Sequence, residues 1–401
     1  MNQFAFTKPK FGFLLLPFLA FLLHSCETET INPSIDQQIA DLGLSALPPV
    51  VHPQDNASSS AKIALGRLLF WDPIVSGHKD VACATCHHPD FGYSDGLDLP
   101  VGVNGSGLGP NRTENTGGLQ LNEPIARVPR NSPSVLNVAY NGMTSAGVYA
   151  PEFAPMFWDG RMLSLESQCQ GPPNSRSEMR GDAYEESSNM DSLIARLSAI
   201  PQYESWFNTA FSEGAASVSR INYTKAMAAF ERTIVTTNSP YDRYLNGNSS
   251  ALTTDQKEGL LLFFGKAKCD NCHAGPMLSD FNFHAVGVPE NPSHPEGIDR
   301  GQDDTYKFRT PTLRNVAITG PYMHNGVLAT IREVVEFMND GVSKNEHVLS
   351  GMMDPDMQPL GLTSEEMDDI VAFLESLTDT NFDKTIPSEV PSGLPVGGNI
   401  H

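Results

Sequence analysis

The sequence has few basic residues for its number of acidic ones. Its 401 residues include 26 lysines and arginines against 47 aspartates and glutamates, which gives a formal net charge of −21. This charge argues against a nucleic-acid partner and indicates that a small partner protein would dock through a basic face. A solvated acidic surface explains the charge equally well.

Convincing alternation of polar and apolar residues is absent, so we expect a mainly helical chain with long loops. The apolar run from Phe11 to Leu23 is short for a membrane-spanning helix, which needs about 20 residues. Hydrophobic residues make up 40% of the chain, enough for two domains with cores of their own. Disorder is therefore not the expected state.

The N-terminal segment has the layout of a secretory signal. Two lysines precede the apolar run, and Leu22-Leu23-His24-Ser25-Cys26 resembles a bacterial lipobox. We therefore predict a lipoprotein signal peptide over 1–26, with Cys26 as the acylated residue that anchors the mature protein to a membrane. Ordinary cleavage or an uncleaved anchor is the alternative, because His24 is unusual in a lipobox. Each case predicts an extracytoplasmic protein, facing the periplasm or attached to the outer membrane.

Four of the six cysteines form two copies of one motif. Cys83-Ala84-Thr85-Cys86-His87 and Cys269-Asp270-Asn271-Cys272-His273 both read Cys-x-x-Cys-His, the attachment site of a c-type haem. In such a site both thiols bond to the haem vinyl groups, and the imidazole reaches the iron. Each copy follows a similar apolar helix, Gly66 to Trp71 and Gly259 to Phe264. The repeat predicts two tandem cytochrome c-like domains, each with one covalent haem c.

Two alternatives for the four thiols are a zinc site and a pair of redox disulfides. Zinc needs no histidine fixed beside each Cys-x-x-Cys pair, and thioredoxin-like chemistry needs a βαβ setting that the sequence does not show. Cys169 is left over, and we expect it to be a buried small residue rather than a reactive thiol.

Local signals place the helices and the domain boundary. A serine-capped helix ends at Asp72-Pro73, and amphipathic patterns cover Asp191 to Phe211 and Ser219 to Thr236. Capping boxes start at Thr253 and Thr363. The expected segments are a signal peptide (1–26), a tether (27–60), a first haem domain (61–238), a second haem domain (239–380) and a C-terminal tail (381–401).

With both motifs placed, the sequence from about Ile63 to Leu377 resembles the bacterial dihaem cytochrome c peroxidase family, which includes the MauG-type enzymes. The runs that carry the resemblance are Leu65 to Phe70, Arg130-Asn131-Ser132-Pro133, Phe157-Trp158-Asp159-Gly160-Arg161, Phe308 to Val316 and Pro321-Tyr322-Met323-His324-Asn325-Gly326. The resemblance implies that the first haem reduces hydrogen peroxide. It implies that the second haem supplies the electrons, received from a small donor such as a cytochrome c or a cupredoxin.

The resemblance also implies the iron ligands. His87 and His273 match the proximal ligands, and Met338, fourteen positions after His324, matches the sixth ligand of the second haem. A thioether raises the potential of a haem iron, as an electron-supplying haem requires. Without the resemblance, a methionine at helical spacing would be interpreted as core.

Cleavage of a peroxide needs a base that takes a proton from one oxygen and returns it to the departing oxygen. Glu178 matches the family's catalytic glutamate, and Gln168 and Pro172 match its neighbours on the open face of the first haem. From sequence alone Glu178 would be a surface carboxylate. Trp158 matches the aromatic between the haems, and packing at an interface is compatible with that role.

Further matches concern a metal ion and the haem propionates. Asn131, with the backbone oxygens of Thr319 and Pro321, matches a calcium site, and hard oxygen ligands suit calcium. Arg309 and Arg314 either pair with propionates or are structural. The resemblance is also compatible with a homodimer.

The leading functional hypothesis is a dihaem cytochrome c peroxidase. The alternative is a MauG-type oxidase that modifies a partner protein or a small molecule, but those enzymes carry a tyrosine at the position of Met338. A pure electron carrier is a third hypothesis, against which Gln168 and Glu178 count. In the family that the sequence resembles, a histidine on the loop before the Arg-Asn segment often ligates the resting first haem, but the loop from Pro89 to Arg130 contains none. The resemblance therefore implies that the first haem rests open or holding only water, with His78 or Met143 as the alternative ligand.

Overall fold

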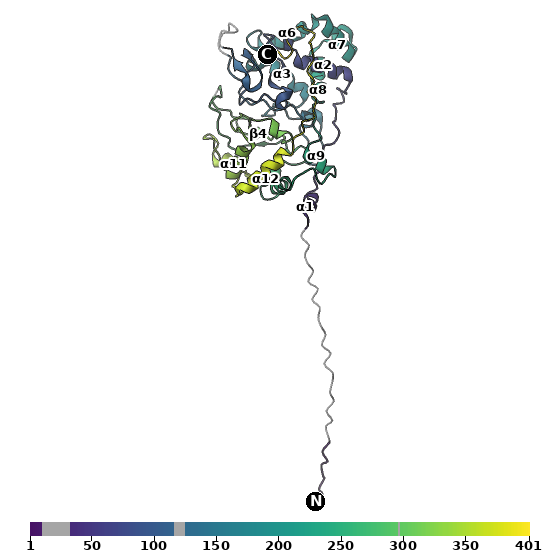
Figure 1. Ribbon diagram of the computed structural model, residues 1–401, viewed down its shortest axis with the longest axis vertical. Helices are drawn as coiled ribbons and strands as arrows, with labels where there is room; N and C mark the ends of the chain where they lie inside the picture. The colour runs from purple at the N-terminus through teal and green to yellow at the C-terminus, as the bar shows by residue number, and fades with distance from the viewer. Residues whose placement is uncertain (10–32, 116–124, 296) are drawn as a thin grey trace.

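Short helices joined by long loops make up the chain (Figure 1). The computed structural model describes residues 1–9, 33–115, 125–295 and 297–401, and about 38% of the chain is helical. The α-helices among these residues are α1 (Ile35–Asp41), α2 (Ser60–Trp71), α3 (Cys83–Cys86), α4 (Leu165–Gln168), α5 (Gly171–Asn174), α6 (Glu186–Ser198), α7 (Pro201–Phe211), α8 (Arg220–Glu231), α9 (Pro240–Leu245), α10 (Thr254–Phe263), α11 (Ile331–Asp340) and α12 (Ser364–Glu375).

Strands are short and few. The antiparallel pairs β1 (Gly105–Ser106) with β2 (Thr113–Glu114), and β3 (Phe283–His284) with β4 (Phe308–Arg309), each have two residues per strand. The expected mainly helical class is therefore confirmed. Within the described ranges no helix is both long and apolar enough to cross a membrane. The predicted lipobox and Cys26 lie outside the described residues.

Helix ends follow local sequence signals closely. The Ser59 side chain caps α2, which stops at Asp72, and Thr253 and Thr363 form the predicted capping boxes of α10 and α12. The helical pattern expected from Asp191 to Phe211 is instead divided between α6 and α7. Pro201 starts α7 because proline has no backbone N–H to donate and fits the first helical turn.

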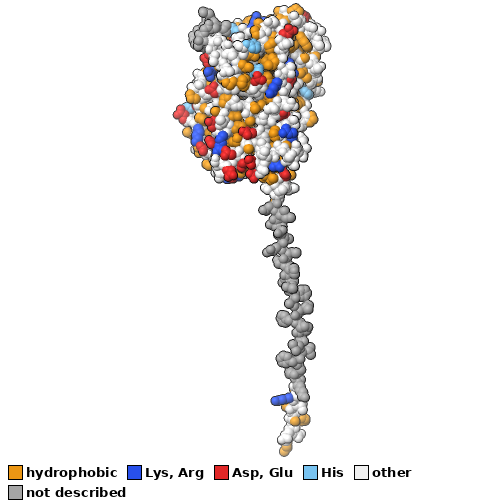
Figure 2. Space-filling view, in the orientation of Figure 1, with side chains coloured by type: hydrophobic (Ala, Val, Ile, Leu, Met, Phe, Trp, Pro, Cys, Tyr) orange, Lys and Arg blue, Asp and Glu red, His pale blue; other side chains and the backbone are white. Residues whose placement is uncertain are grey.

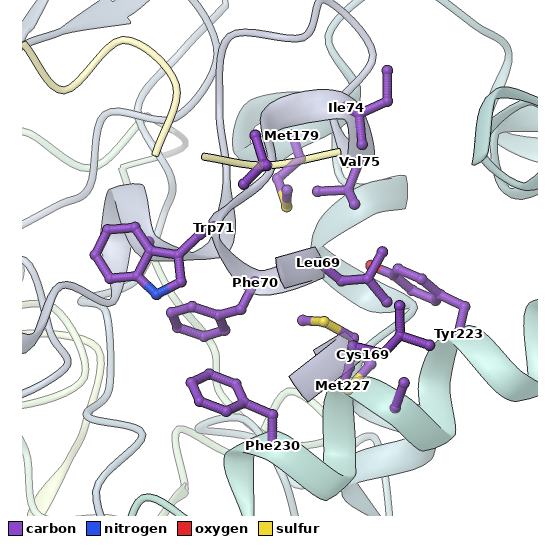
Figure 3. Close-up of a cluster of buried hydrophobic side chains, with 14 of the residues drawn as sticks. Leu69, Phe70, Trp71, Ile74, Val75, Cys169, Met179, Tyr223, Met227 and Phe230 are labelled. Carbon is purple, nitrogen blue, oxygen red and sulfur yellow. The ribbon is translucent and has the colours of Figure 1, made fainter. Parts of the chain in front are cut away.

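The first hydrophobic core forms where α2 crosses α8. Its largest members include Leu69, Phe70, Trp71, Tyr203, Phe207, Tyr223, Met227 and Phe230. Phe70 and Phe230 meet edge to face with ring centroids 5.2 Å apart, and Figure 3 shows Met227 and Cys169 beside them. Gly66 permits this close crossing, because an added Cβ would lie 2.7 Å from Cβ of Phe230 and would overlap the carbonyl oxygen of Ala226.

The second core repeats this arrangement with α10 and α12. Gly259 occupies the place of Gly66, and an added Cβ there would overlap the carbonyl oxygen of Asp369 on α12. Leu260, Phe263, Ile370, Phe373 and Leu374 are among its buried members. Each Cys-x-x-Cys-His motif therefore follows a helix that is held in a close, glycine-dependent crossing.

Helix α1 and the C-terminal segment pack on opposite cores. Ile39 of α1 belongs to the second core and is 2% exposed, so part of the expected tether is packed. Phe382 and Val390 belong to the first core, so the expected C-terminal tail is packed as well. In Figure 1, α1 lies near α12, whereas the C-terminus lies beside α3 at the other end.

A symmetric pair of asparagines ties the two cores together at Thr236. The side-chain amides of Asn137 and Asn315 each donate to the Thr236 hydroxyl at 2.6 Å. Both asparagines have a left-handed backbone and precede a 3-10 turn, a conformation that asparagine tolerates well. The predicted domain boundary at 238 lies close to this joint.

The surface reflects the composition. Figure 2 shows acidic side chains gathered over the end of the molecule that carries α11 and α12. Asp255, Glu258 and Asp369 form one exposed to half-buried group there, on α10 and α12. An acidic end would attract a basic partner, and docking there stays a prediction beside the alternative of a solvated surface.

We predict that Gly66→Ala destabilises the protein by about 1–3 kcal/mol, the usual penalty for overpacking a core. The added methyl would force α2 and α8 apart. Denaturant unfolding of the haem-loaded protein measures the change. Gly351→Ala is the control, because an added Cβ there meets nothing within 4 Å. An unchanged free energy of unfolding in Gly66→Ala would contradict the close crossing.

Candidate haem-binding cavity

A partly open cavity of about 1490 Å³ runs past both Cys-x-x-Cys-His motifs. The cysteines and the histidine of each motif contribute to its wall. Pockets for a single small molecule usually measure about 300–1,000 Å³. The cavity is therefore large enough for more than one cofactor, and the structure brings both motifs to the same space.

The motif thiols are free, and burial favours the protonated form of Cys86 and Cys269. All five described cysteines are unpaired, so neither motif forms a disulfide. Among the described residues the thiols do not gather into a metal-binding group. Burial raises the pKa of Cys86 and of Cys269 to about 12. The structure therefore favours neither a zinc site nor redox disulfides, and buried thiols facing a cavity suit addition to haem vinyl groups.

Each motif histidine is oriented by a backbone carbonyl. Nδ1 of His87 donates to the Tyr93 carbonyl oxygen at 3.1 Å, and Nδ1 of His273 donates to that of Leu278 at 2.8 Å. Nε2 is then left as the metal-binding nitrogen. Burial lowers the pKa of His87 to about 4 and also lowers that of His273. Both rings are therefore neutral at physiological pH, as iron ligands must be.

Three of the four predicted catalytic residues, Gln168, Pro172 and Glu178, line the cavity beside the first motif, and Trp158 also lines it. Gln168 ends α4, Pro172 lies in α5, and Glu178 lies in the π-helical turn Arg176–Arg180. Burial raises the pKa of Glu178, and a hydrogen bond from Ser175 only partly offsets this effect. The carboxyl group therefore sits in an environment that favours its protonated form more than a surface position would.

Trp158 lies between the first motif and the second half of the chain. Its indole N–H donates to the Asn131 carbonyl oxygen at 2.9 Å, and its own carbonyl oxygen accepts from the Arg309 backbone N–H at 2.8 Å. The next residue after Asn131 is Ser132, whose hydroxyl donates to the Cys86 carbonyl oxygen at 2.8 Å. A continuous series of contacts thus runs from the first motif through Trp158 to β4.

Arg309 provides the test of whether the cavity fits an anionic cofactor. Arg309 is 7% exposed, and its guanidinium donates to the carbonyl oxygens of Phe157 and Thr310. Burial lowers its pKa to about 10, and no described carboxylate counteracts this. A buried cation without a carboxylate partner is costly unless an anion joins it. A haem propionate fits that requirement, so the residues present fit the cofactor.

Arg314 differs from Arg309 in this respect. It is 3% exposed and forms a buried ion pair with Asp242, at 2.8 Å between Nη1 and Oδ1. Its Nε donates to the Pro276 carbonyl oxygen, while Nη2 has no protein partner. Asp242 already neutralises its charge, so the geometry favours the structural alternative, with Nη2 left for a further acceptor.

Met338 lies on α11 and lines the cavity on the side of the second motif. It is half-buried, although Phe337 and Val335 of the same helix are buried. Met357, from the loop after α11, also lines the cavity. Nothing in the sequence pointed to the thioether of Met357.

The expected calcium ligands lie along one wall of the cavity. Nδ2 of Asn131 donates to the Leu97 carbonyl oxygen at 2.8 Å, and its backbone N–H donates to the His324 carbonyl oxygen at 2.8 Å. Thr319 and Pro321 line the same cavity. The structure thus brings the Asn131 segment against the segment that holds the other two proposed ligands.

Comparisons with known proteins agree with this geometry. Residues 60–250 match the family described as di-haem cytochrome c peroxidase. The chain is 34% identical to the methylamine utilization protein MauG of Methylorubrum extorquens, over 82% of this chain and 81% of that protein. This chain belongs to the di-haem cytochrome c peroxidase family. It is therefore an oxidoreductase, and the family implies two c-type haems.

Further members and structures extend the match. The chain is 34% identical to the cytochrome-c peroxidase IdrP1 of Denitromonas iodatirespirans, over 84% of this chain and 86% of that protein. A MauG-like protein associated with microbial copper homeostasis aligns with a TM-score of 0.67 at 29% identity, covering 84% of this chain and 94% of that one. The similarity therefore spans both halves of the chain.

In this family member the cavity wall includes a buried carboxyl group that sequence analysis missed. Glu231 of α8 is 7% exposed, and its Oε2 lies 3.9 Å from the Cys169 thiol. Burial raises its pKa to about 8. Cys169 is itself 4% exposed, as expected of a buried small residue. The available signal was a charged residue inside the apolar pattern of the helix predicted from Ser219 to Thr236.

His284 was also missed, and it lines the cavity beside the second motif. Its Nδ1 lies 2.6 Å from Oδ2 of Asp354, and its Nε2 lies 3.0 Å from Oδ2 of Asp280. Hydrogen bonds with Asp280, then Cys272 and then Asp354 raise its pKa to about 11, against the opposing effect of burial. The protonated ring therefore joins the loop after α11 to the segment that follows the second motif.

We predict that the free energy of unfolding falls as pH rises from about 5 to about 8, and that Glu231→Gln makes this fall smaller. The folded-state pKa of about 8 lies above the ordinary value of 4.5, so the folded protein binds more protons than the unfolded chain in this window. Stability must then fall as pH rises. Glutamine removes this contribution, which should exceed about 1.4 kcal/mol, the equivalent of one pKa unit.

Denaturant unfolding of the haem-loaded protein across this pH range measures the effect. Glu186→Gln is the matched control, because the Glu186 side chain is 75% exposed. That variant should keep the wild-type pH profile. Parallel profiles for the wild type and Glu231→Gln would show that Glu231 does not titrate in this window.

Proposed function

We propose that the protein reduces hydrogen peroxide to water with two electrons taken one at a time from a small donor protein, a cytochrome c or a cupredoxin. The observation that carries the proposal is the position of Glu178, with Gln168 and Pro172, on the cavity wall beside the first motif. An electron carrier has no use for a proton-transferring carboxyl group at an open iron. The predicted signal peptide and Cys26 anchor support an extracytoplasmic site of action.

The proposed organisation gives each haem its own domain. Residues 61–238 would hold the first haem through Cys83, Cys86 and His87, and residues 239–380 the second through Cys269, Cys272 and His273. When bound, the haem irons supply the electron exchange with peroxide and donor. The two helix crossings, one beside each motif, support this division.

Glu178 would move the proton that peroxide cleavage requires. Its carboxylate takes the proton from one peroxide oxygen and returns it to the other as the O–O bond breaks. The overall reaction consumes two electrons and two protons and yields two waters. A pKa raised by burial suits this role, because a group that both accepts and donates a proton works best when its pKa approaches the working pH. The amide of Gln168 would orient the peroxide.

The second half of the chain would deliver the electrons. A thioether from Met338 would favour the reduced state of the second iron. Trp158 would place a π-system between the haems, and its hydrogen bonds to Asn131 and Arg309 hold it from both sides. A calcium ion on Asn131, Thr319 and Pro321 would stiffen the same junction.

The second candidate function is that of a MauG-type oxidase acting on a partner protein or a small molecule. The 34% identity to a MauG protein favours it. Met338 counts against it, because the resemblance implies a tyrosine at that position in MauG-type enzymes. Donor-dependent peroxide turnover without any partner substrate would distinguish the peroxidase.

We predict that Glu178→Gln slows peroxide turnover by at least the roughly 10²-fold that general acid–base catalysis contributes, while both haems stay attached. The amide keeps the size of the side chain but cannot carry the proton. Stopped-flow mixing with peroxide measures the rate. Glu186→Gln is the control, since Glu186 also lines the cavity, and it should retain wild-type turnover. Equal rates for Glu178→Gln and the wild type would remove Glu178 from the mechanism.

A second prediction concerns the resting state of the first haem. His78 and Met143 are the rival ligands that the sequence offers. Nε2 of His78 accepts from the Asp182 backbone N–H at 3.3 Å, and Met143 is 1% exposed in a cluster with Met277. Neither is among the described residues that line the cavity. Residues 116–124 of the loop without histidine lie outside the described residues.

Electron paramagnetic resonance of the fully oxidised protein tests this state. We expect one high-spin ferric haem, because neither His78 nor Met143 is among the described residues that line the cavity. Two low-spin haems at rest, with activity only after prior reduction, would contradict the prediction.

A further inference from the structure

The C-terminal segment returns to the first haem motif. After α12 ends at Glu375, residues 381–400, here called the C-terminal strap, run back along the first core (Figure 1). Phe382 and Val390 are 8% and 4% exposed within that core. The chain just before the strap is fixed at the joint between the cores, where the Asp379 backbone N–H donates to Oδ1 of Asn315 at 2.9 Å.

The far end of the strap contacts the motif itself. Thr85, which lies between the two motif cysteines, donates its hydroxyl to the Gly397 carbonyl oxygen at 2.9 Å. The same hydroxyl accepts from the Ala82 backbone N–H at 2.9 Å. Gly397 also donates its N–H to the Trp71 carbonyl oxygen at 2.7 Å. The strap thus joins the turn that carries the thiols to the end of α2.

A second contact reaches the proximal histidine through Tyr93. The Tyr93 hydroxyl donates to the Asp383 carbonyl oxygen at 2.6 Å, and its ring packs on Phe382 with centroids 5.8 Å apart. The Tyr93 carbonyl oxygen accepts the Nδ1–H of His87. Tyr93 has a left-handed backbone with φ of 56°, an uncommon conformation for a bulky residue that its surroundings must hold. Tyr93 therefore contacts the strap through its hydroxyl and the proposed iron ligand His87 through its carbonyl oxygen.

The second motif lacks this connection. Leu278 takes the place of Tyr93, and its carbonyl oxygen accepts the Nδ1–H of His273. A leucine side chain has no hydroxyl to donate. The second haem site can therefore serve as an internal control, because His87 is connected to the strap through Tyr93 and His273 is not.

We propose that Tyr93 is a positioning residue for the first iron, held by the C-terminal strap so that its carbonyl oxygen keeps the hydrogen bond to His87. A hydrogen bond from Nδ1–H makes the imidazole a stronger electron donor to its metal. Loss of the strap contact should therefore raise the potential of the first haem and leave that of the second unchanged, because the bond from His273 to Leu278 does not involve the strap. The inference rests on the haem-ligand roles of the proposed function.

The test compares the two haem potentials in Tyr93→Phe, which removes only the hydroxyl that donates to Asp383. Spectroelectrochemical titration of the haem-loaded protein should show a rise in the midpoint potential of the first haem and no change in that of the second. Proton exchange at Nδ1 of His87, followed by NMR, should become faster. Tyr140→Phe is the matched control. It removes a hydroxyl donated to the Pro48 carbonyl oxygen at 2.9 Å from a tyrosine that is 2% exposed, and it should leave both potentials unchanged.

A second variant tests the proposal if Tyr93→Phe folds poorly. Asp383→Asn keeps the strap backbone but weakens the ion pair with Arg67 that holds Asp383 in place. It should move the first potential in the same direction by a smaller amount. Unchanged potentials in the variants that fold, equal shifts of both haems, or a shift of the same size in Tyr140→Phe would each overturn the proposal. None of these measurements needs peroxide turnover, so failure of this proposal can be distinguished from failure of the proposed peroxidase reaction.

Discussion

The hydrogen bonds of Trp158 connect the two halves of the cavity. The indole binds the segment that touches the first motif, and the Trp158 carbonyl oxygen binds β4 of the second half. Beside this junction lies Arg309, buried without a carboxylate partner. An anionic cofactor would stabilise a buried guanidinium in this position, and haem binding and the joining of the two halves would then depend on each other. The proposed electron path crosses the molecule at the same point.

Features set by neighbouring residues were predictable from sequence. The caps at Ser59, Thr253 and Thr363 and the stop at Asp72 need only local hydrogen bonds, and the structure confirms them. The haem motifs are contiguous in sequence, so their chemistry was predictable as well. Contacts between residues far apart in the sequence were not predictable. The hydrogen bond from Thr85 to Gly397 joins residues 312 positions apart, and no periodicity indicates that a proline- and glycine-rich tail returns to the first core.

The residues of the candidate site likewise fall into those that the sequence revealed and those that only the fold revealed. Residue types with a dedicated chemistry, the motif cysteines and histidines, were found from the sequence. Glu178 would have been a surface carboxylate without the family resemblance, and only the fold shows that burial raises its pKa. Glu231 and His284 were missed because their significance comes from partners on other elements. Arg314 shows the converse, since its ion pair with Asp242 accounts for its charge without a propionate.

Steady-state turnover with a reduced small cytochrome c as donor tests the central claim most directly. Peroxide consumption and donor oxidation are followed together, starting from fully oxidised enzyme and from enzyme reduced beforehand. The account predicts two donor molecules oxidised per peroxide, at equal rates and without a lag in both cases. Absence of peroxide-dependent donor oxidation from both starting states would contradict it and would leave an oxidase acting on another partner as the better description.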